Sequence, residues 1–236
     1  MKYDELLEII QKRRSIRRFK PDPIPDEFID KIVEAARWAP SGGNLQPWEL
    51  VVVKDRELKD GVVRILRSVM ELYRQMEVAR EPWQLKAPQK PPSPPGSIAN
   101  DFSSAPVFII MFGDNRTSLG LPMSRRYDPH TRDFAVISGL AGAFLYMHLA
   151  VTTLGLASQW VSAVATPYGN CMVKNLLGIP LELDAYDLMA VGYPDGEPAP
   201  RFVRDRNEIV HYDYCGEDAF RNNEAVRDFI FKLRNS

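Results

Sequence analysis

The densest group of chemically capable side chains lies between Lys12 and Lys20 (KRRSIRRFK), where six of nine residues are basic and none is acidic. Guanidinium groups bind phosphate through forked, charge-assisted hydrogen bonds. In an extended chain alternate side chains share a direction, so Ser15 and Arg17 should reach one ligand together. The run therefore predicts a discrete anion site. A solvated basic face and a nucleic-acid patch are the alternatives that the same composition allows.

A second candidate is the segment from Ala39 to Trp48 (APSGGNLQPW). Pro40 should stop a helix, and the Ser-Gly-Gly-Asn stretch after it should bend so that backbone N–H groups can approach a ligand closely. Asn44 and Gln46 add amide donors and acceptors. Without a ligand, the same segment is an ordinary connection between a helix and a strand.

A third candidate follows the Gly192-Tyr193-Pro194 stretch, where Arg201, Arg204 and Arg206 stand close together. One or two of these side chains could close an anion site from the side opposite the first basic run. A surface loop with no ligand is the alternative.

Motifs for other chemistries are absent from the sequence. It has no G-x-G-x-x-G after a strand, and no G-x-x-x-x-G-K-[ST], H-E-x-x-H or G-x-S-x-G pattern. Three histidines and two cysteines leave little material for a metal centre or a serine triad. An enzyme with this sequence would therefore depend on a bound cofactor.

Composition predicts an ordinary globular chain. The 236 residues are 45% hydrophobic and 26% charged, with a formal net charge of −1, which argues against a general binder of polyanions. Helices and strands should alternate without repeats or a linker, so we expect one α/β or α+β domain over residues 1–236. Acidic residues near the start and the lack of a C-x-x-C pair favour a reducing cytoplasm.

Periodicity and turn residues place the elements. The expected helices cover residues 4–14, 25–39, 55–80, 134–154, 170–177 and 217–236, and the expected strands cover residues 48–53, 106–113, 156–164 and 187–193. Residues 15–20 should be extended. Residues 65–130, which include the proline-rich run Pro88–Pro95, should form a variable lid or substrate-side insertion, with a flexible surface loop as the alternative.

One stretch also suits a membrane. Residues 134–154 contain no charged side chain over 21 residues, which is long enough to span a bilayer. The polar side chains of Ser138 and His148 and the absence of a basic flank after the stretch favour a buried core helix and no membrane association. Small residues such as Gly139 and Gly142 would let another backbone approach it closely.

The three candidate segments, in this order, resemble the nitroreductase family of FMN-dependent oxidoreductases. The similarity covers RRSIRRF, PSGGNLQPW, the small-residue helix, GLASQWVSAV and AVGYP. It implies an α+β sandwich in which helices flank a central, mostly antiparallel sheet. It also implies a homodimer with an exchanged terminal extension and two FMN sites at the subunit interface.

Carried over by position, the resemblance assigns the FMN phosphate and ribityl chain to Arg13, Arg14 and Ser15. It places Arg17 beside the N1/O2 edge of the isoalloxazine. Two-electron reduction puts negative charge at that edge, so a fixed guanidinium there stabilises the reduced flavin. The cofactor would carry the hydride at N5, which explains the missing nucleophiles.

The resemblance draws the remaining contacts from three further segments. Pro40, Ser41, Gly42 and Asn44 would reach the flavin of the neighbouring subunit. Arg204 or Arg206 would complete the phosphate clamp. A stretch expected to be strand would pass flavin N5 through its backbone, and it consists of Trp160, Val161, Ser162 and Ala163.

The resemblance predicts a cycle in which NADH or NADPH reduces FMN and leaves, and a small organic acceptor such as a nitroaromatic or a quinone is then reduced in the same place. Deiodinases of this superfamily clamp an amino acid with Glu, Tyr and Lys, whereas here Glu71 and Tyr73 precede a proline run. Enzymes of the superfamily that degrade reduced flavin to dimethylbenzimidazole are a further alternative, and they have a different residue near the position of Asn44. A flavin store or sensor, and a non-catalytic module that binds phosphate or nucleic acid, complete the alternatives.

Overall fold

The computed structural model describes residues 2–81, 102–198, 201–216 and 220–235. The chain divides into two compact units, one of residues 1–70 and 98–198 and the other of residues 71–97 and 199–236. The single domain expected over residues 1–236 stays a prediction. The run Pro88–Pro95 lies outside the described residues.

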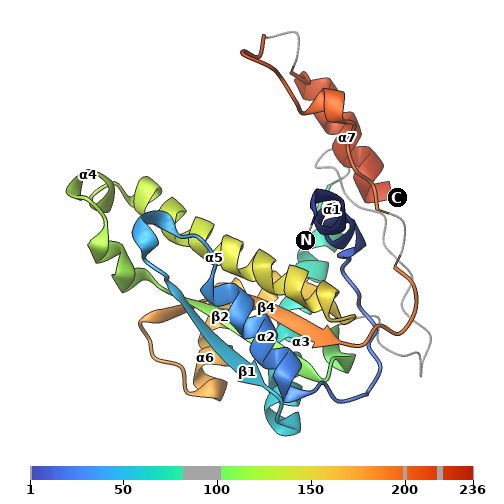
Figure 1. The fold of residues 1–236 in the computed structure, drawn as a ribbon. Helices are drawn as coiled ribbons and strands as arrows, with labels where there is room; N and C mark the ends of the chain where they lie inside the picture. Colours follow the sequence, from blue (N-terminus) through green and yellow to red (C-terminus); the bar gives the residue numbers. More distant parts are fainter. Residues whose placement is uncertain (1, 82–101, 199–200, 217–219, 236) are drawn as a thin grey trace. The chain divides into compact units, whose positions relative to one another are not determined.

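The first unit is built on one antiparallel sheet of four strands (Figure 1). The strands are β1 (Trp48–Val53), β2 (Val107–Asp114), β3 (Ala157–Val161) and β4 (Leu183–Gly192), in the spatial order β1-β2-β4-β3. β2 is buried along almost its whole length because it lies inside the sheet and helices cover both faces. The expected antiparallel sheet is confirmed.

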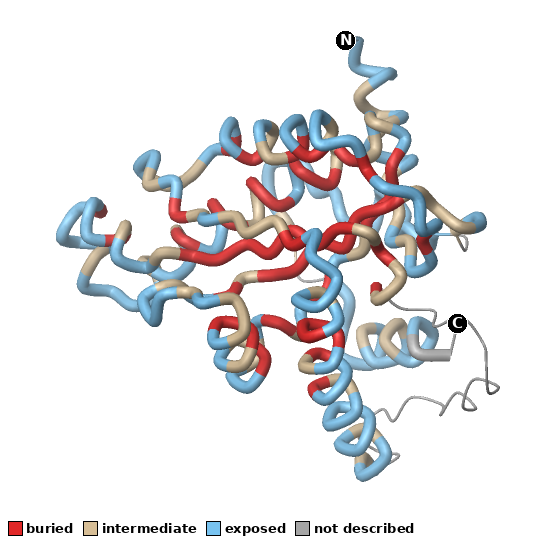
Figure 2. Tube along the Cα trace, turned by 90° about the horizontal axis from the view of Figure 1, so that it is seen from below, coloured by how far each residue is buried: buried red, intermediate tan, exposed pale blue. Residues whose placement is uncertain are grey.

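Two helices pack on each face of the sheet. On one face, α2 (Asp26–Arg37) and α5 (Pro129–Thr153) bury apolar side chains against Ile109 and Met111. On the other, the first turns of α3 (Arg56–Val78) and α6 (Pro167–Leu177) complete a second cluster. Figure 2 shows the buried trace concentrated in the sheet and on the helix sides turned toward it. The predicted α+β sandwich is confirmed.

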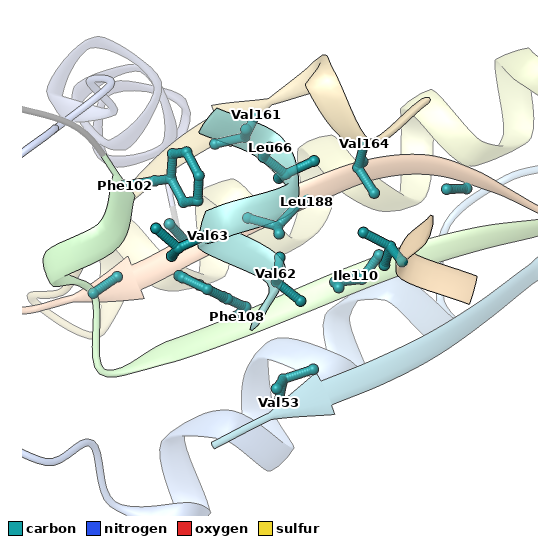
Figure 3. Packing of buried hydrophobic residues seen from close by; sticks show 14 of the residues in the cluster. Val53, Val62, Val63, Leu66, Phe102, Phe108, Ile110, Val161, Val164 and Leu188 are labelled. Carbon is teal, nitrogen blue, oxygen red and sulfur yellow. The ribbon is translucent and has the colours of Figure 1, made fainter. Parts of the chain in front are cut away.

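Figure 3 shows the second cluster at close range. Val62, Val63 and Leu66 of α3 pack onto Phe108 and Ile110 of β2. These side chains are almost fully buried. Each large apolar side chain buried in this way contributes about 1.5–3 kcal/mol to the free energy of unfolding. The sheet is therefore a rigid base for the loops at its edges.

The remaining elements lie around this core or in the second unit. α1 (Tyr3–Lys12) precedes the basic run, and the short α4 (Met123–Arg126) precedes α5. α7 (Asn223–Asn235) belongs to the second unit. A helix was expected from residue 217, whereas α7 begins at Asn223.

α5 begins five residues before the predicted start. The Asp128 carboxylate accepts hydrogen bonds from the N–H groups of His130 and Thr131, and Pro129 occupies the first turn. Both features fix a helix N-terminus. α5 is also long and apolar enough to cross a membrane. Here it packs along one side against the sheet and α2, as the expectation of a core helix requires.

The predicted strand 156–164 is wrong at its end. β3 stops at Val161, and Ser162–Ala165 form a 3₁₀ turn. Thr166 caps the next helix through a hydrogen bond from the Gly169 N–H, with Pro167 in its first turn. The chain must therefore leave the sheet within four residues. Of the stretch expected to pass flavin N5 as a strand, only Trp160 and Val161 are strand.

Candidate functional site

The basic run follows the free edge of the sheet. Ser15 forms an isolated parallel bridge with Ser158 of β3, and the Ile16 N–H donates to the Ser158 carbonyl at 3.0 Å. The Ile16 side chain packs on the core, while the side chains of Ser15 and Arg17 are exposed. Both exposed side chains are thus available to one ligand outside the sheet edge, as the alternation predicted.

A polar and aromatic cluster centred on the buried His148 lies next to this edge. His148 of α5 is 1% exposed, and its Nδ1 lies 2.7 Å from Ser158 Oγ. Its ring stacks on that of Trp160, with 5.3 Å between centroids and 14° between planes. Burial, and to a lesser extent the positive charge of Arg13, lowers the pKa of His148 to about 3. The imidazole is therefore neutral at physiological pH, and Arg13 lies within electrostatic reach of it.

Arg14 lines a cavity of about 370 Å³ at the same edge. Thr152 of α5 and Ser158 of β3 share this cavity with it, and Glu197 adds a carboxylate. The first predicted segment therefore lies against the last turns of α5 and the start of β3. Guanidinium, hydroxyl and backbone groups are gathered there, which is a donor set that suits a phosphate ester.

The second predicted segment forms a strained, compact turn. Gly43, Asn44 and Gln46 all have positive φ, at 62°, 55° and 46°. The Ser41 Oγ accepts a hydrogen bond from the Gln46 N–H at 3.0 Å, and the Ser41 carbonyl accepts one from the Asn44 N–H. Such non-glycine conformations persist only where the surroundings enforce them, and they gather at functional sites.

This turn, which includes Pro40, Ser41, Gly42 and Asn44, packs on the N-terminal half of α5. A Cβ on Gly42 would lie 3.3 Å from Ala135 Cβ, and one on Gly139 would lie 3.0 Å from Ser41 Cβ. The small residues of α5 therefore do admit another backbone, which is this turn of the same chain.

The two predicted segments contact α5 at well-separated points along the helix. The turn contacts Gly139, whereas Arg14 shares its cavity with Thr152, 13 residues further along the helix. At 1.5 Å per residue, these contact points are about 20 Å apart. One chain thus brings the basic run to β3, and it does not bring the turn to the basic run.

The end of β3 faces a larger cavity. Ser162 and Ala165 line it, together with Asp187 of β4 and Leu140 of α5, and its volume is about 720 Å³. Ser162 is exposed, while Val161 is buried in the core and Ala163 is half-buried against it. The segment expected to face the flavin therefore borders open space.

Arg204 and Arg206 belong to the second unit, so their place relative to Arg13 stays a prediction. Arg204 is held by the Glu208 side chain at 3.2 Å and by the Glu208 carbonyl at 2.8 Å. Arg206 donates to the Tyr212 hydroxyl at 2.7 Å. Two acceptors on Glu208 hold the Arg204 guanidinium, whereas the Tyr212 hydroxyl is the acceptor for Arg206.

Two buried groups were missed by the sequence reasoning. His148 stood in an apolar helix as one of its polar residues, and Asp187 stood at the start of an expected strand. Asp187 is 6% exposed, and burial raises its pKa even though the neighbouring polar groups of Ser162 and Trp160 lower it. An acid in an apolar run was the available signal. No group of three metal-ligating side chains occurs among the residues that the structure describes.

The residues along the sheet edge suit FMN. Arg13 and Arg14 supply cationic donors for a phosphate, Ser15 supplies a hydroxyl, and Arg17 presents an exposed guanidinium two residues further on. Among the described residues, Arg17 forms no ion pair or hydrogen bond with the protein. Its charge is available to a ligand.

Comparison with known proteins agrees with this geometry. Residues 10–193 match the model of the Nitroreductase family. Iodotyrosine deiodinase 1 of Rattus norvegicus is 32% identical over 208 residues, which cover 86% of this chain and 67% of the relative. A relative from Archaeoglobus fulgidus, with the provisional name NADH dehydrogenase/NAD(P)H nitroreductase, is 28% identical over 82% of this chain and 88% of its own.

A solved structure extends the comparison to a bound cofactor. Oxidised iodotyrosine deiodinase bound to FMN and 3-iodo-L-tyrosine superposes with a TM-score of 0.64 and 27% identity, covering 89% of this chain and all of that one. The family match, the relatives and the shared fold agree. The chain belongs to the Nitroreductase family.

Proposed function

We propose that this chain is an FMN-dependent oxidoreductase that takes hydride from NADH or NADPH and passes it to an organic acceptor such as a nitroaromatic or a quinone. The observation that carries the proposal is the row of outward-facing donors along the edge of β3. Membership of a family whose solved relatives bind FMN supports it. The Archaeoglobus relative supports a nicotinamide donor.

FMN, when bound, supplies the hydride-carrying N5 that the protein lacks. In the proposal, Arg13, Arg14 and Ser15 bind the phosphate and ribityl groups, and Arg204 adds a further cation. Arg17 places its positive charge beside the N1/O2 edge and stabilises negative charge there. The 3₁₀ turn after Val161 presents backbone groups to the ring.

The proposal requires a homodimer, because Ser41 and Asn44 lie about 20 Å along α5 from the Arg14 cavity of their own chain. Two copies packed across α5 would exchange these turns. α5 also exposes large apolar side chains on its free side, with Phe134 67% and Ile137 52% exposed. Apolar side chains that face solvent in this way suit a protein interface.

The second unit supports an exchanged terminal extension. Its described residues expose Phe202, Tyr214 and Phe220 by 54%, 83% and 65%. Covering such side chains with a second copy would remove apolar surface from water.

Cys171 and Cys215 are free thiols, which is consistent with the reducing cytoplasm expected from the sequence.

The first test is the absorbance spectrum of the pure protein, followed by anaerobic titration with NADH and with NADPH. A flavin spectrum that bleaches with a nicotinamide supports the proposal. Colourless protein that takes up no added FMN contradicts it and favours a phosphate or nucleic-acid binding module. A yellow protein that neither nicotinamide reduces would be a flavin store.

The second test is complementation between two variants. Arg17→Ala removes a donor of the basic run, and Asn44→Gly removes the amide of the turn while tolerating its positive φ. In a purified heterodimer one of the two sites would regain both native segments, so FMN occupancy should be about half that of the wild type. A site built from one chain would leave every site defective.

Deiodination of a halogenated tyrosine is the second candidate, because the similarity to iodotyrosine deiodinase covers 86% of this chain. Among the described residues, Glu71 forms hydrogen bonds with Arg74 and Gln75 of its own helix. An acid held in this way is not an open clamp for an amino acid. Iodide release from 3-iodo-L-tyrosine by the reduced protein, measured beside nitroaromatic reduction, separates the two reactions.

A further inference from the structure

A β-bulge in β4 turns an acidic side chain into the core beside the proposed flavin segment. Met111 of β2 pairs with Asp187, whereas the next residue pairs with Ala185, so Tyr186 is left as the extra residue. Bulges re-aim side chains and are common beside functional sites. The bulge places the Asp187 carboxylate under the end of β3.

The Asp187 carboxylate connects the two residues on either side of Val161. Its Oδ2 accepts a hydrogen bond from Trp160 Nε1 at 2.6 Å. Ser162, on the other side of Val161, lines the same cavity as Asp187 and lowers the pKa of the carboxylate. Trp160 is the penultimate residue of β3, and Ser162 is the first residue of the 3₁₀ turn. One buried group thus fixes the point at which the chain leaves the sheet.

Packing does not fix this point by itself. Ser162, Asp187 and Tyr186 all line the cavity of about 720 Å³, so the turn lacks close neighbours on that side. Among the described residues, Asp187 Oδ1 has no hydrogen-bond partner. Burying a carboxylate with one unsatisfied oxygen is costly, and an apolar residue would pack here without that cost. The acid is explained if its hydrogen bond to Trp160 is needed at the end of β3.

We propose that Asp187 is a positioning residue, which holds the Trp160–Ser162 segment so that its backbone meets the isoalloxazine. The inference rests on the proposed function, because that function places the flavin at this segment. It goes beyond that function in naming a residue that does not touch the cofactor. Its effect on the ring is indirect, through the indole N–H of Trp160 and the side chain of Ser162.

The test compares Asp187→Ala, Asp187→Asn and a control, Asp133→Asn. Asp133 lines the same cavity, but it is exposed and pairs with Arg132, with no bond to β3. Asparagine keeps an acceptor for the Trp160 N–H, while alanine removes it. We expect Asp187→Ala to raise the FMN dissociation constant about tenfold, the size of one charge-assisted hydrogen bond. Asp187→Asn and Asp133→Asn should stay close to the wild type.

Two further readouts separate positioning from general stability. The reduction potential of the bound flavin should shift in Asp187→Ala and be restored in Asp187→Asn, which a loss of global stability alone would not produce. In the FMN-free protein, amide hydrogen exchange of residues 160–165 should accelerate in Asp187→Ala while the exchange of β2 amides stays slow.

The outcomes also distinguish this inference from the proposed function. Wild-type protein that binds no FMN would end the proposed function, and the exchange measurement would still show whether Asp187 holds the turn. FMN affinity, potential and exchange all unchanged in Asp187→Ala would overturn the inference. If Asp187→Ala does not fold, Trp160→Phe removes the same hydrogen bond and keeps the ring. Wild-type values in Trp160→Phe would then overturn the inference.

Discussion

The two ends of α5 solve different problems. From its N-terminal half to its midpoint the helix uses Gly139 and Gly142 to admit a strained turn, and the closest groups of the turn are Ser41 Cβ and the Pro40 carbonyl. Near its C-terminal end it uses His148, which is bonded to Ser158 and stacked on Trp160 beneath the basic run. The first contact region of α5 supports the turn that includes Ser41 and Asn44, and the second supports the basic run. The separation of about 20 Å between them is why two copies of the chain are needed to complete the proposed site.

The largest expected effect is a loss of stability at acidic pH, caused by His148 near the C-terminal end of α5. The pKa of His148 is about 3 in the folded protein, compared with an ordinary value of 6.5 for the unfolded chain. Between these two pH values the unfolded chain binds a proton at His148 that the folded chain does not bind. Stability from this group is full above pH 6.5 and is lost progressively as the pH falls toward 3. At pH 5 the loss should be roughly 2 kcal/mol.

His148→Phe should remove this dependence. Urea unfolding of the FMN-free protein at pH 7.5 and pH 5, at fixed protein concentration, measures the change in unfolding free energy for each variant. The variant should lose roughly 2 kcal/mol less than the wild type between these values. Asp187 has a raised pKa and titrates in both proteins, so its contribution cancels in the comparison. Parallel pH profiles would show that His148 is not the sensor.

The next effect concerns the donor row above that cluster. Arg17→Ala should weaken FMN binding by roughly 1.5–2 kcal/mol, or about 10- to 30-fold, because one charge-assisted hydrogen bond at an exposed site is lost. The fold should be intact, because the Arg17 side chain is exposed. FMN fluorescence titration measures the change.

Arg18→Ala is the matched control for Arg17→Ala. Arg18 is the neighbouring exposed arginine, and its guanidinium donates to the Asp195 carbonyl at 3.1 Å. Its loss should change FMN affinity little. Equal losses from the two variants would mean that general positive charge holds the ligand, and would favour the nucleic-acid alternative.

The sequence predicted what local rules decide. β1 follows from the β-branched run after Pro47, and it begins and ends where expected. The outward direction of Ser15 and Arg17 follows from alternation in an extended chain. These features depend on neighbours in sequence, so one sequence is enough to find them.

The sequence could not supply what distant packing decides. The end of β3 depends on the turn into α6, and the burial of Asp187 depends on a bulge that appears only when β4 pairs with β2. The early start of α5, in contrast, could have been predicted locally. Asp128 and Pro129 form a helix N-cap, but they lie in a charged stretch that was expected to be irregular. The sequence alone therefore did not predict the end of β3 or the buried Asp187, which we propose to position the segment that faces the flavin.

The smallest expected effect tests the N-terminal end. Alanine is favoured over glycine inside a helix by about 1 kcal/mol. A Cβ on Gly142 would lie 3.6 Å from the Pro40 carbonyl, an ordinary contact, so Gly142→Ala should be stabilising by up to that amount. A Cβ on Gly139 would lie 3.0 Å from Ser41 Cβ, so Gly139→Ala must displace the turn. The steric cost of this displacement should cancel the stabilisation by alanine or exceed it.

Urea unfolding and FMN titration of both variants measure this contrast. Gly139→Ala should be less stable than Gly142→Ala by about 1–2 kcal/mol and should also bind FMN more weakly, because the displaced turn carries Asn44 to the partner's site in the proposed dimer. If Gly139→Ala is as stable as Gly142→Ala and binds FMN as the wild type does, close backbone contact at this end is not what holds the turn. The difference between the two ends of α5 would then lie in the exposed apolar side of the helix, and variants of Phe134 and Ile137 would decide whether that side pairs the subunits.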